Sequence, residues 1–490
     1  MKRTGHELGA QSDLYTHAVA ESVGRLRAWI TGFSGALGGL LFGYDWVVIG
    51  GAKPFYEAYF GITSPALEAW AMSCALLGCL IGALASGILS DRKGRRSVLM
   101  ASAILFTVSS LGIACCNSLV AFVLWRILGG SAIGAASEVA PVFLAEIAPS
   151  SLRGRFVAMN QIAIVVGILA AQSVNWLIAR PVPARSTPLW MAHSWNAQWG
   201  WRWMFGITAI PALFFFFATL IIPESPRWLL ARFRLADALR AFRKLGVPDA
   251  EAAAISQRCM RNYTVSPERI SKPQSSHGIW SHPAVRRVLL LGICIAVLQQ
   301  WSGINIIFAY AQDVFSQAGY SVSQSLFQIV LTGVVNLLFT LLALGLVDRL
   351  SRRALLLAGL STLAAIYTLL GWMIHTHLHG LPIVTLLLAA IAAYAMTLAP
   401  VSWIVIAEMY PARLRGRAMS ITVAALWIAS FALTSSFPLI RADLGLARAF
   451  WLYAVVCALG CAILARWLPE TGGHSLEDVE QKLYAEGETG

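Results

Sequence analysis

Twelve runs of about 20 apolar residues dominate this chain and leave few folds open to it. A run of that length crosses a bilayer as a helix, because lipid offers the backbone no hydrogen-bond partners. Of the 490 residues, 58% are hydrophobic and 12% are charged, whereas soluble domains have about 25% charged residues. We therefore predict an all-α membrane protein with twelve spans, near 28–50, 67–89, 97–116, 119–143, 156–179, 201–222, 287–311, 326–347, 354–374, 381–406, 418–440 and 446–468.

Lys and Arg are distributed unevenly among the segments that connect these runs. With the N-terminus in the cytoplasm, 30 of the 37 Lys and Arg residues fall on the cytoplasmic side and six in outer segments, while Arg126 alone lies inside a span. Cytoplasmic loops of membrane proteins carry such an excess. We expect a multi-pass protein of the cell membrane with both termini in the cytoplasm. The net charge of +13 then reflects orientation and does not indicate a nucleic-acid partner.

Two motifs recur in the second half of the chain. AEIAPSSLRGR (145–155) returns as AEMYPARLRGR (407–417) with seven of eleven positions identical, and DRKGRR (91–96) returns as DRLSRR (348–353). Each copy follows the corresponding span of its half. Repeats of this kind indicate two pseudo-symmetric bundles with a binding site between them near the midplane.

The chain divides accordingly into four parts. We predict a first six-helix bundle at 1–222, a helical linker at 223–285, a second six-helix bundle at 286–470 and a tail at 471–490. The linker is basic, with apolar residues at helical spacing, so we expect helices packed on the cytoplasmic ends of the bundles. The tail begins with a capping-box pattern at Ser475 and predicts one short helix. The alternative for both segments is a flexible charged linker.

Several motifs resemble those of one known family. They are GILSDRKGRR (87–96), PESPRWL (223–229), QQWSGIN (299–305), LVDRLSRR (346–353) and PETGG (469–473), together with the repeated AE…RGR. The chain resembles the sugar porters of the major facilitator superfamily over nearly its whole length. The resemblance implies alternating access, in which two six-helix bundles rock around a central monosaccharide site.

A site for a neutral sugar needs amides and an aromatic face in an apolar pocket. On a continuous helix Gln299 and Asn305 are offset by about 120°, and Gly303 between them allows a local bend. Each amide has an alternative role as an interhelical hydrogen bond, and Trp427 has one in core packing. The resemblance implies sugar contacts for Phe42, Gln161, Gln299, Gln300, Asn305, Asn336, Trp403 and Trp427.

Two residues at the edge of the implied pocket bear on which sugar is the substrate. Ile168 and Phe308 stand where a bacterial xylose symporter of the family has Gln and Leu, and where animal glucose facilitators have Ile and Phe. The pocket edge therefore looks more like that of a glucose carrier. Leu426 stands where the family usually has Gln or Asn, which puts the identity of the sugar in doubt.

Asp45 lies within the first apolar run, in the stretch LLFGYDWVVIGG (40–51). A carboxylate at the centre of a membrane helix costs about 2.5–3.5 kcal/mol on insertion scales, and Arg126 is the partner we expect for it. The resemblance implies proton coupling, because a carboxylate here marks proton-coupled members and an amide marks facilitators. We expect Asp45 to stay ionised beside Arg126 and to take up a proton when rocking loosens the pair. The alternative is a permanent structural salt bridge.

The repeated charged loops predict cytoplasmic ion pairs that exchange as the bundles rock. Simple anchoring by positive charge is the alternative for them. Glu138 is either a further member of this set or a second proton site. The predicted gate residues are Asp91, Arg95, Glu146, Arg153, Arg155, Asp348, Arg352, Glu408, Arg415 and Arg417.

We therefore predict a transporter that imports a glucose-like hexose, or xylose, by proton symport. Its expected partners are the sugar, the proton and the lipid bilayer, and a monomer suffices. We find no pattern for an enzyme, a cofactor or a metal site; the histidines of HTHLHG (375–380) are expected in a solvated loop. An equilibrative facilitator and a sugar sensor remain as alternatives; Asp45 argues against the first and the short tail against the second.

Overall fold

The computed structural model describes residues 4–148, 153–183, 186–264, 283–347, 349–410 and 415–469. Every regular element in these ranges is helical. Twelve of the helical stretches described there are long and apolar enough to cross a membrane. The predicted all-α class and the predicted number of spans are thus confirmed.

The first bundle contains six spans, of which the sixth is composite. It begins with a π-helical turn, η2, and continues through α7 and α8. A short helix, α6, precedes it in the segment that follows α5. The elements are α1 (Thr4–Phe60), α2 (Pro65–Lys93), α3 (Arg95–Cys115), α4 (Leu119–Ile147), α5 (Arg153–Ile178), α6 (Pro188–His193), η2 (Asn196–Gly200), α7 (Trp201–Gly206) and α8 (Ala209–Ile221).

Three short helices follow the first bundle, and six further spans follow them. The short helices enclose a small apolar core of their own around Leu230 and Phe242. They are α9 (Pro226–Ala231), α10 (Leu235–Lys244) and α11 (Asp249–Thr264). The second bundle comprises α14 (Pro283–Trp301), α15 (Ile304–Ala309), α16 (Ala311–Gln317), α17 (Val322–Leu346), α18 (Arg352–His375), α19 (Leu381–Met396), α20 (Leu398–Met409), α21 (Arg415–Leu444) and α22 (Leu446–Trp467).

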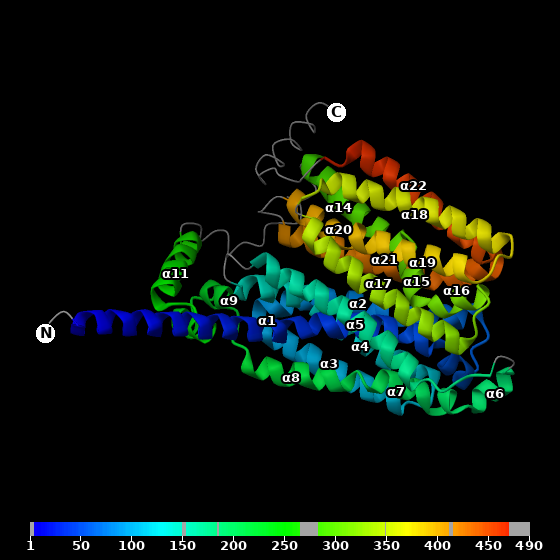
Figure 1. Cartoon of the computed structure of the whole chain (residues 1–490), viewed down its shortest axis with the longest axis horizontal. Helices are drawn as coiled ribbons and strands as arrows, with labels where there is room; N and C mark the ends of the chain where they lie inside the picture. Colours follow the sequence, from blue (N-terminus) through cyan, green and yellow to red (C-terminus); the bar gives the residue numbers. More distant parts are fainter. Residues whose placement is uncertain are drawn as a thin grey trace.

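The spans run roughly along the long axis of the molecule (Figure 1). Helices α9 and α11 lie at one end, which we call the linker end, and α6 and α16 lie at the opposite end, which we call the far end. The tail 471–490, with the helix predicted after Ser475, lies outside the described residues.

Small residues set the close packing of the helices that carry the central charges. A Cβ added at Gly43 of α1 would lie 1.9 Å from the carbonyl oxygen of Ile164 on α5. A Cβ added at Gly130 of α4 would lie 1.9 Å from the carbonyl oxygen of Ala75 on α2. Only glycine permits this approach of backbones, which is how membrane helices associate without a hydrophobic driving force. The two contacts hold α1 against α5 and α4 against α2, and they lie close in sequence to Asp45 and Arg126.

The first helix extends further than the sequence indicated. The apolar run was expected to end near residue 50, with Lys53 beyond it in an outer segment, whereas α1 continues through Pro54 to Phe60. Lys53 is 3% exposed, so the expectation that Arg126 is the only cation inside a span was wrong. The physical reason is that Lys53 has carboxylate partners from three other positions in the fold, which offset the cost of burying its charge.

Candidate transport site

The seventh span is broken at Gly303. Helix α14 ends at Trp301 and α15 begins at Ile304, and Gly303 between them has a φ of +82°. A Cβ at this position would also lie 2.9 Å from the Tyr453 ring, so both backbone angle and space require glycine. A broken membrane helix is tolerated where it is buried in protein or lines a cavity. The break therefore marks the interior of the second bundle as a candidate site.

The three amides of this span form one hydrogen-bonded chain around the break. Asn305 Nδ2 donates to Gln300 Oε1 at 2.5 Å, and Gln300 Nε2 donates to Gln299 Oε1 at 3.5 Å. Gln299 Nε2 donates to the Leu398 carbonyl at 3.3 Å, where α20 begins. Because the helix is interrupted, residues that a straight helix would separate by 120° belong to one polar group. All three amides are at most 8% exposed.

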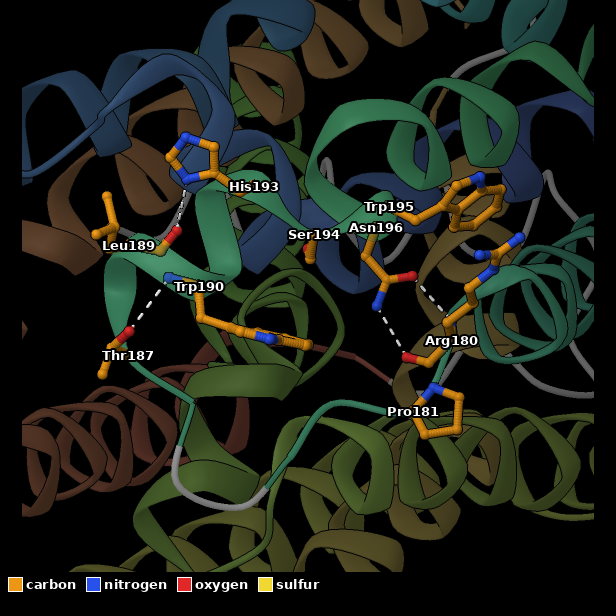
Figure 2. A pocket seen from close by; sticks show the side chains of 9 residues that line it. All are labelled: Arg180, Pro181, Thr187, Leu189, Trp190, His193, Ser194, Trp195 and Asn196. Atoms are coloured by element: carbon orange, nitrogen blue, oxygen red, sulfur yellow. Dashed lines mark hydrogen bonds between the residues drawn. The ribbon is translucent and has the colours of Figure 1, made fainter.

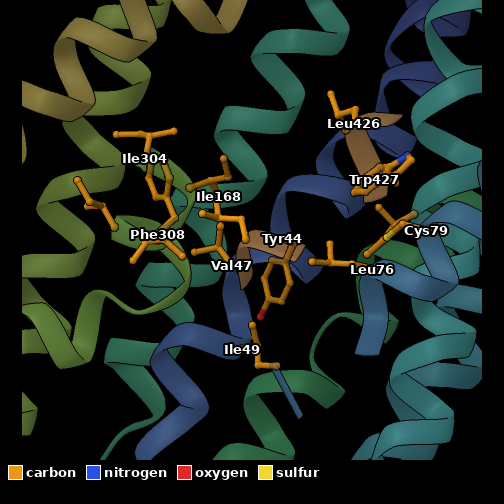
Figure 3. Packing of buried hydrophobic residues seen from close by; sticks show 14 of the residues in the cluster. Tyr44, Val47, Ile49, Leu76, Cys79, Ile168, Ile304, Phe308, Leu426 and Trp427 are labelled. Carbon is orange, nitrogen blue, oxygen red and sulfur yellow. The ribbon is translucent and has the colours of Figure 1, made fainter. Parts of the chain in front are cut away.

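Aromatic rings from both bundles lie next to one another near the centre. The Phe42 ring of α1 lies 6.0 Å from the Trp427 ring of α21 at an angle of 63°, and 6.2 Å from the Trp46 ring. The Trp46 ring lies 6.3 Å from the Phe308 ring of α15. Trp427 Nε1 is buried and has no hydrogen-bond partner among the described residues, so this N–H is a donor without an acceptor. Figure 3 shows Trp427 and Phe308 among the buried apolar side chains of both bundles.

The remaining predicted sugar contacts lie on other helices. Asn336 of α17 is buried, and Gln161 of α5 and Trp403 of α20 are half-buried. Ile168, Phe308 and Leu426 are all buried in the main apolar cluster (Figure 3).

A further amide, Gln172, was not singled out in the sequence. Its Nε2 donates to Thr332 Oγ1 at 3.2 Å and so joins α5 of the first bundle to α17 of the second.

Asp45 and Arg126 form a buried ion pair. Arg126 NH1 lies 2.9 Å from Asp45 Oδ2, and both side chains are 3% exposed. The guanidinium also lies over the Phe205 ring, 5.4 Å from its centroid. Both residues belong to the first bundle, one on α1 and one on α4, so the pair does not bridge the two bundles. A charge removed from water is tolerated when it is paired in this way.

Two groups of charges lie at the linker end, each within one bundle. In the first bundle, Arg95 lies 3.1 Å from Asp91 and 3.2 Å from Glu146. In the second bundle, Arg352 pairs with Glu408. Arg155 and Arg417 are exposed. Asp348 and the side chains of Arg153 and Arg415 lie outside the described residues.

Glu224, in the PESPRW stretch, caps the third span. Its Oε1 accepts hydrogen bonds from the backbone N–H groups of Arg95, Arg96 and Ser225 at 3.0, 3.1 and 2.8 Å. A carboxylate at a helix N-terminus satisfies free N–H groups and complements the helix dipole. Burial raises the pKa of the Glu224 carboxyl, while the three N–H donors act in the opposite direction. This contact attaches the linker to the turn between α2 and α3.

Glu138 lies towards the linker end of α4. Ser86 Oγ of α2 donates to its Oε2 at 2.8 Å. This contact joins α2 to α4 within the first bundle.

A separate hollow of about 490 Å³ lies at the far end, beside α6 (Figure 2). Arg180 lies over the Trp195 ring at 4.4 Å. The Asn196 side chain donates to the Arg180 carbonyl and accepts from the Arg180 N–H, both at 2.8 Å. None of the residues that line the hollow is among the predicted site residues. The hollow is lined by Arg180, Pro181, Thr187, Leu189, Trp190, His193, Ser194, Trp195 and Asn196.

Comparison with known proteins agrees with this arrangement. The family model described as "Sugar (and other) transporter" matches residues 31–483. The chain belongs to the sugar transporter family. It is 36% identical over 458 residues to a galactose-proton symporter of Escherichia coli, with 92% of this chain and 93% of that protein covered.

Solved structures of a xylose transporter share the fold of this sugar transporter. The inward-open conformation of XylE from Escherichia coli superposes with a TM-score of 0.77 at 31% identity, covering 93% of this chain and 99% of that chain. The proton:xylose symporter XylE bound to 6-bromo-6-deoxy-D-glucose superposes with a TM-score of 0.76 at 31% identity and the same coverage. The predicted membership of the sugar porters and the predicted fold are confirmed, and so is the expectation of a transporter rather than an enzyme.

Sequence reasoning missed several residues of this transporter that the structure brings to notice. Trp46 directly follows Asp45, and its aromatic character beside a buried carboxylate was a usable signal. Lys53 was expected outside the first span. Its partners Glu68 and Asp313, and also Arg441, lie on three other helices, so sequence spacing did not predict the contacts.

Proposed function

We propose that this transporter imports a monosaccharide together with protons by alternating access. The observation that carries the proposal is the buried Asp45–Arg126 ion pair at 2.9 Å. An ionisable residue inside a membrane span is costly, and where one occurs it commonly serves a proton relay or a transport pathway. The galactose-proton symporter that the chain resembles supports the same reading.

The pair suggests how proton binding and conformation are linked. A proton on Asp45 removes the negative charge that holds Arg126, so the protonated and ionised forms favour different packing of α1 against α4. Helix α1 also carries Phe42 and Trp46, whose rings contact Trp427 and Phe308 of the second bundle. A change at Asp45 is therefore transmitted along one helix to the surface between the bundles, which is a bistable element of the kind that switching requires.

The sugar is proposed to bind between the amide chain and the aromatic rings. Gln299, Gln300 and Asn305 offer donors and acceptors to hydroxyl groups, and the unpaired Trp427 N–H offers a further donor. Neutral groups suit a neutral ligand, because no charge has to be desolvated. Further contacts are proposed for Phe42, Gln161, Asn336 and Trp403.

The pocket edge favours a hexose as the substrate. Ile168 and Phe308, both buried, present apolar surface rather than an amide at that edge. A glucose-like hexose is therefore our first candidate, and xylose is the second.

The linker end is proposed to face the cytoplasm, with both termini on that side. Lys and Arg are concentrated in the segments at this end, as in cytoplasmic loops generally. The groups around Glu146 and Glu408 then form the inner gate, and each carboxylate is held by an arginine of its own bundle in this conformation. We propose that the chain is a monomer in the cell membrane. Its proposed domains are the bundles 1–222 and 286–470, the linker 223–285 and the tail 471–490.

The proposal is tested by uptake into proteoliposomes. Labelled glucose is offered with and without an inward proton gradient, with unlabelled xylose as competitor. Accumulation above equilibrium only with the gradient supports symport. Asp45→Asn should abolish accumulation and leave sugar exchange, while Asp443→Asn, which removes an exposed carboxylate, should change neither.

Two results would contradict the proposal. Equilibration of glucose regardless of the gradient would identify an equilibrative facilitator. Loss of exchange as well as accumulation in Asp45→Asn would make the ion pair purely structural. If xylose moves and glucose does not, transport stands and the assignment of the hexose fails.

A further inference from the structure

A ring of four alternating charges closes across the two bundles at the far end. Lys53 Nζ lies 2.6 Å from Asp313 Oδ2 and 2.8 Å from Glu68 Oε1. Arg441 NH1 lies 2.7 Å from Asp313 Oδ2, and its NH2 donates to both oxygens of Glu68 at 2.9 and 3.1 Å. Every charge in the ring therefore has two neighbours of opposite sign.

The ring contains two residues from each bundle. Lys53 of α1 and Glu68 of α2 belong to the first bundle, and Asp313 of α16 and Arg441 of α21 belong to the second. The Lys53–Asp313 and Glu68–Arg441 contacts consequently cross from one bundle to the other. The other two sides of the ring stay within a bundle.

Two members of the ring are buried and two are half-buried. The Lys53 side chain is 4% exposed and that of Glu68 is 11% exposed, while Asp313 and Arg441 are 21% and 25% exposed. Lys53 also lies over the Tyr310 ring at 5.4 Å. Burial makes each charge costly unless it is paired, so the closed ring is stable only while the bundles stay together at this end.

Separation of the bundles here would replace the crossing contacts with water. Each charge would keep one partner and gain hydration, so the open form also satisfies the four groups. Two satisfied arrangements of the same residues constitute a bistable element. The linker-end pairs Arg95–Glu146 and Arg352–Glu408 differ in this respect, because each lies within one bundle.

We propose that Lys53, Glu68, Asp313 and Arg441 form the outer gate of the transport cycle. The closed ring holds the outer mouth shut, and the Lys53–Asp313 and Glu68–Arg441 contacts break each time the transporter opens to the outside. This inference rests on the orientation and transport function proposed above. Lys53 follows Asp45 by eight residues, or about 12 Å along the same helix, so α1 carries both the proton-coupling pair and the gate.

Glu57 lies beside the ring without closing it. Its Oε1 lies 3.7 Å from Lys53 Nζ and has no hydrogen-bond partner among the described residues. This contact lies within α1 and does not cross between the bundles. The gate is defined by the four ring residues.

Hydrogen–deuterium exchange of the full-length protein in nanodiscs tests the gate. In Asp313→Asn, peptides at the far ends of α1, α2 and α16 should exchange faster, and peptides at the linker end of α4 and α20 more slowly. The opening equilibrium should shift by about tenfold toward the outward-open form, since the buried Lys53 ammonium loses its charged partner in the other bundle. Asp313→Glu, which keeps the charge, should restore most of the unsubstituted pattern.

A matched control and a second readout make the test decisive. Asp443→Asn removes an exposed carboxylate two residues from Arg441 and should leave exchange unchanged at both ends. Faster exchange at both ends of Asp313→Asn would indicate general destabilisation, and unchanged exchange at the far end would show that the ring does not hold the mouth shut; either result overturns the proposal. Uptake by the unsubstituted protein is measured separately, so a failure of sugar transport is distinguished from a failure of the gate.

Discussion

Trp46 and Asp45 are consecutive on α1 and contact different neighbours of that helix. The Asp45 carboxylate pairs with Arg126 inside the first bundle, whereas the Trp46 ring lies 6.3 Å from the Phe308 ring of the second bundle. A helix turns by about 100° per residue, so neighbours in sequence point to different surroundings. The residue that we assign to the proton is thereby joined through one peptide bond to a residue at the bundle interface.

We predict that Trp46→Leu weakens sugar binding without abolishing proton coupling. Aromatic contacts of this kind contribute about 0.5–1.5 kcal/mol, which corresponds to about a two- to tenfold increase in KM. The KM for uptake and the ratio of protons to sugar should be measured together. Trp372→Leu, at an exposed position, is the control and should alter neither. A loss of coupling in Trp46→Leu would place this indole in the proton mechanism instead.

We predict that Arg126→Gln destabilises the protein more than Arg126→Gln combined with Asp45→Asn. The single change leaves Asp45 buried without its cation, and breaking a buried ion pair from one side costs about 3–5 kcal/mol. The double change leaves two neutral groups and should recover part of that loss. Thermal unfolding of all four combinations in detergent gives the coupling. Additive effects would show that the two side chains do not interact in the folded state.

Gly303→Ala should be destabilising and should impair sugar binding. Its φ of +82° and the Tyr453 ring 2.9 Å from an added Cβ both oppose a side chain, and such backbone strain costs about 1–3 kcal/mol. Relief of the strain would move Asn305 relative to Gln300. The measurement is thermal stability together with sugar-dependent quenching of tryptophan fluorescence. Gly345→Ala on α17, where no atom lies within 4 Å of the added Cβ, should be neutral or stabilising.

The parts of this fold that follow from local pattern were predictable from sequence. Apolar run length predicted the twelve spans, and the repeated AE…RGR motif predicted two bundles. Gly303 was recognised as a place where the seventh span can bend, because glycine alone adopts its backbone angle without strain. Asp45 and Arg126 were expected to pair because both are conspicuous charges in apolar runs.

The charge ring was not predictable in the same way. Lys53 was expected beyond the first span, because the apolar run was placed at 28–50. Its burial depends on Asp313 and on a ring completed by Arg441, which only tertiary packing brings to it. Trp46 escaped notice for a related reason, since its function depends on which side of α1 meets α15. Pattern identifies a span, but the contacts around it set its end and its orientation.

Gly94→Ala and Glu224→Gln should each loosen the linker from the first bundle. Gly94 has a φ of +96°, and a Cβ there would lie 2.1 Å from Glu224 Oε2, so the alanine would displace the cap of α3. The glutamine loses the negative charge at the helix N-terminus, worth about 0.3–1 kcal/mol. Melting temperature should fall in both variants. Glu251→Gln, at an exposed position in the first turn of α11, is the control and should change it least.

Ile168→Gln combined with Phe308→Leu should shift preference from glucose toward xylose. The change places an amide at the pocket edge in place of apolar surface. This amide forms a hydrogen bond with a sugar that reaches it and stays unpaired beside a sugar that does not. An unsatisfied buried amide costs about 1–3 kcal/mol, or about a five- to 150-fold change in relative affinity. Competition of xylose against labelled glucose measures the ratio directly. Leu426→Gln, introduced in the same background, should raise affinity for both sugars, because it adds a donor and an acceptor beside Trp427. An unchanged ratio in the double variant would remove these two side chains from the substrate argument and leave the amides of the seventh span as the determinants of specificity.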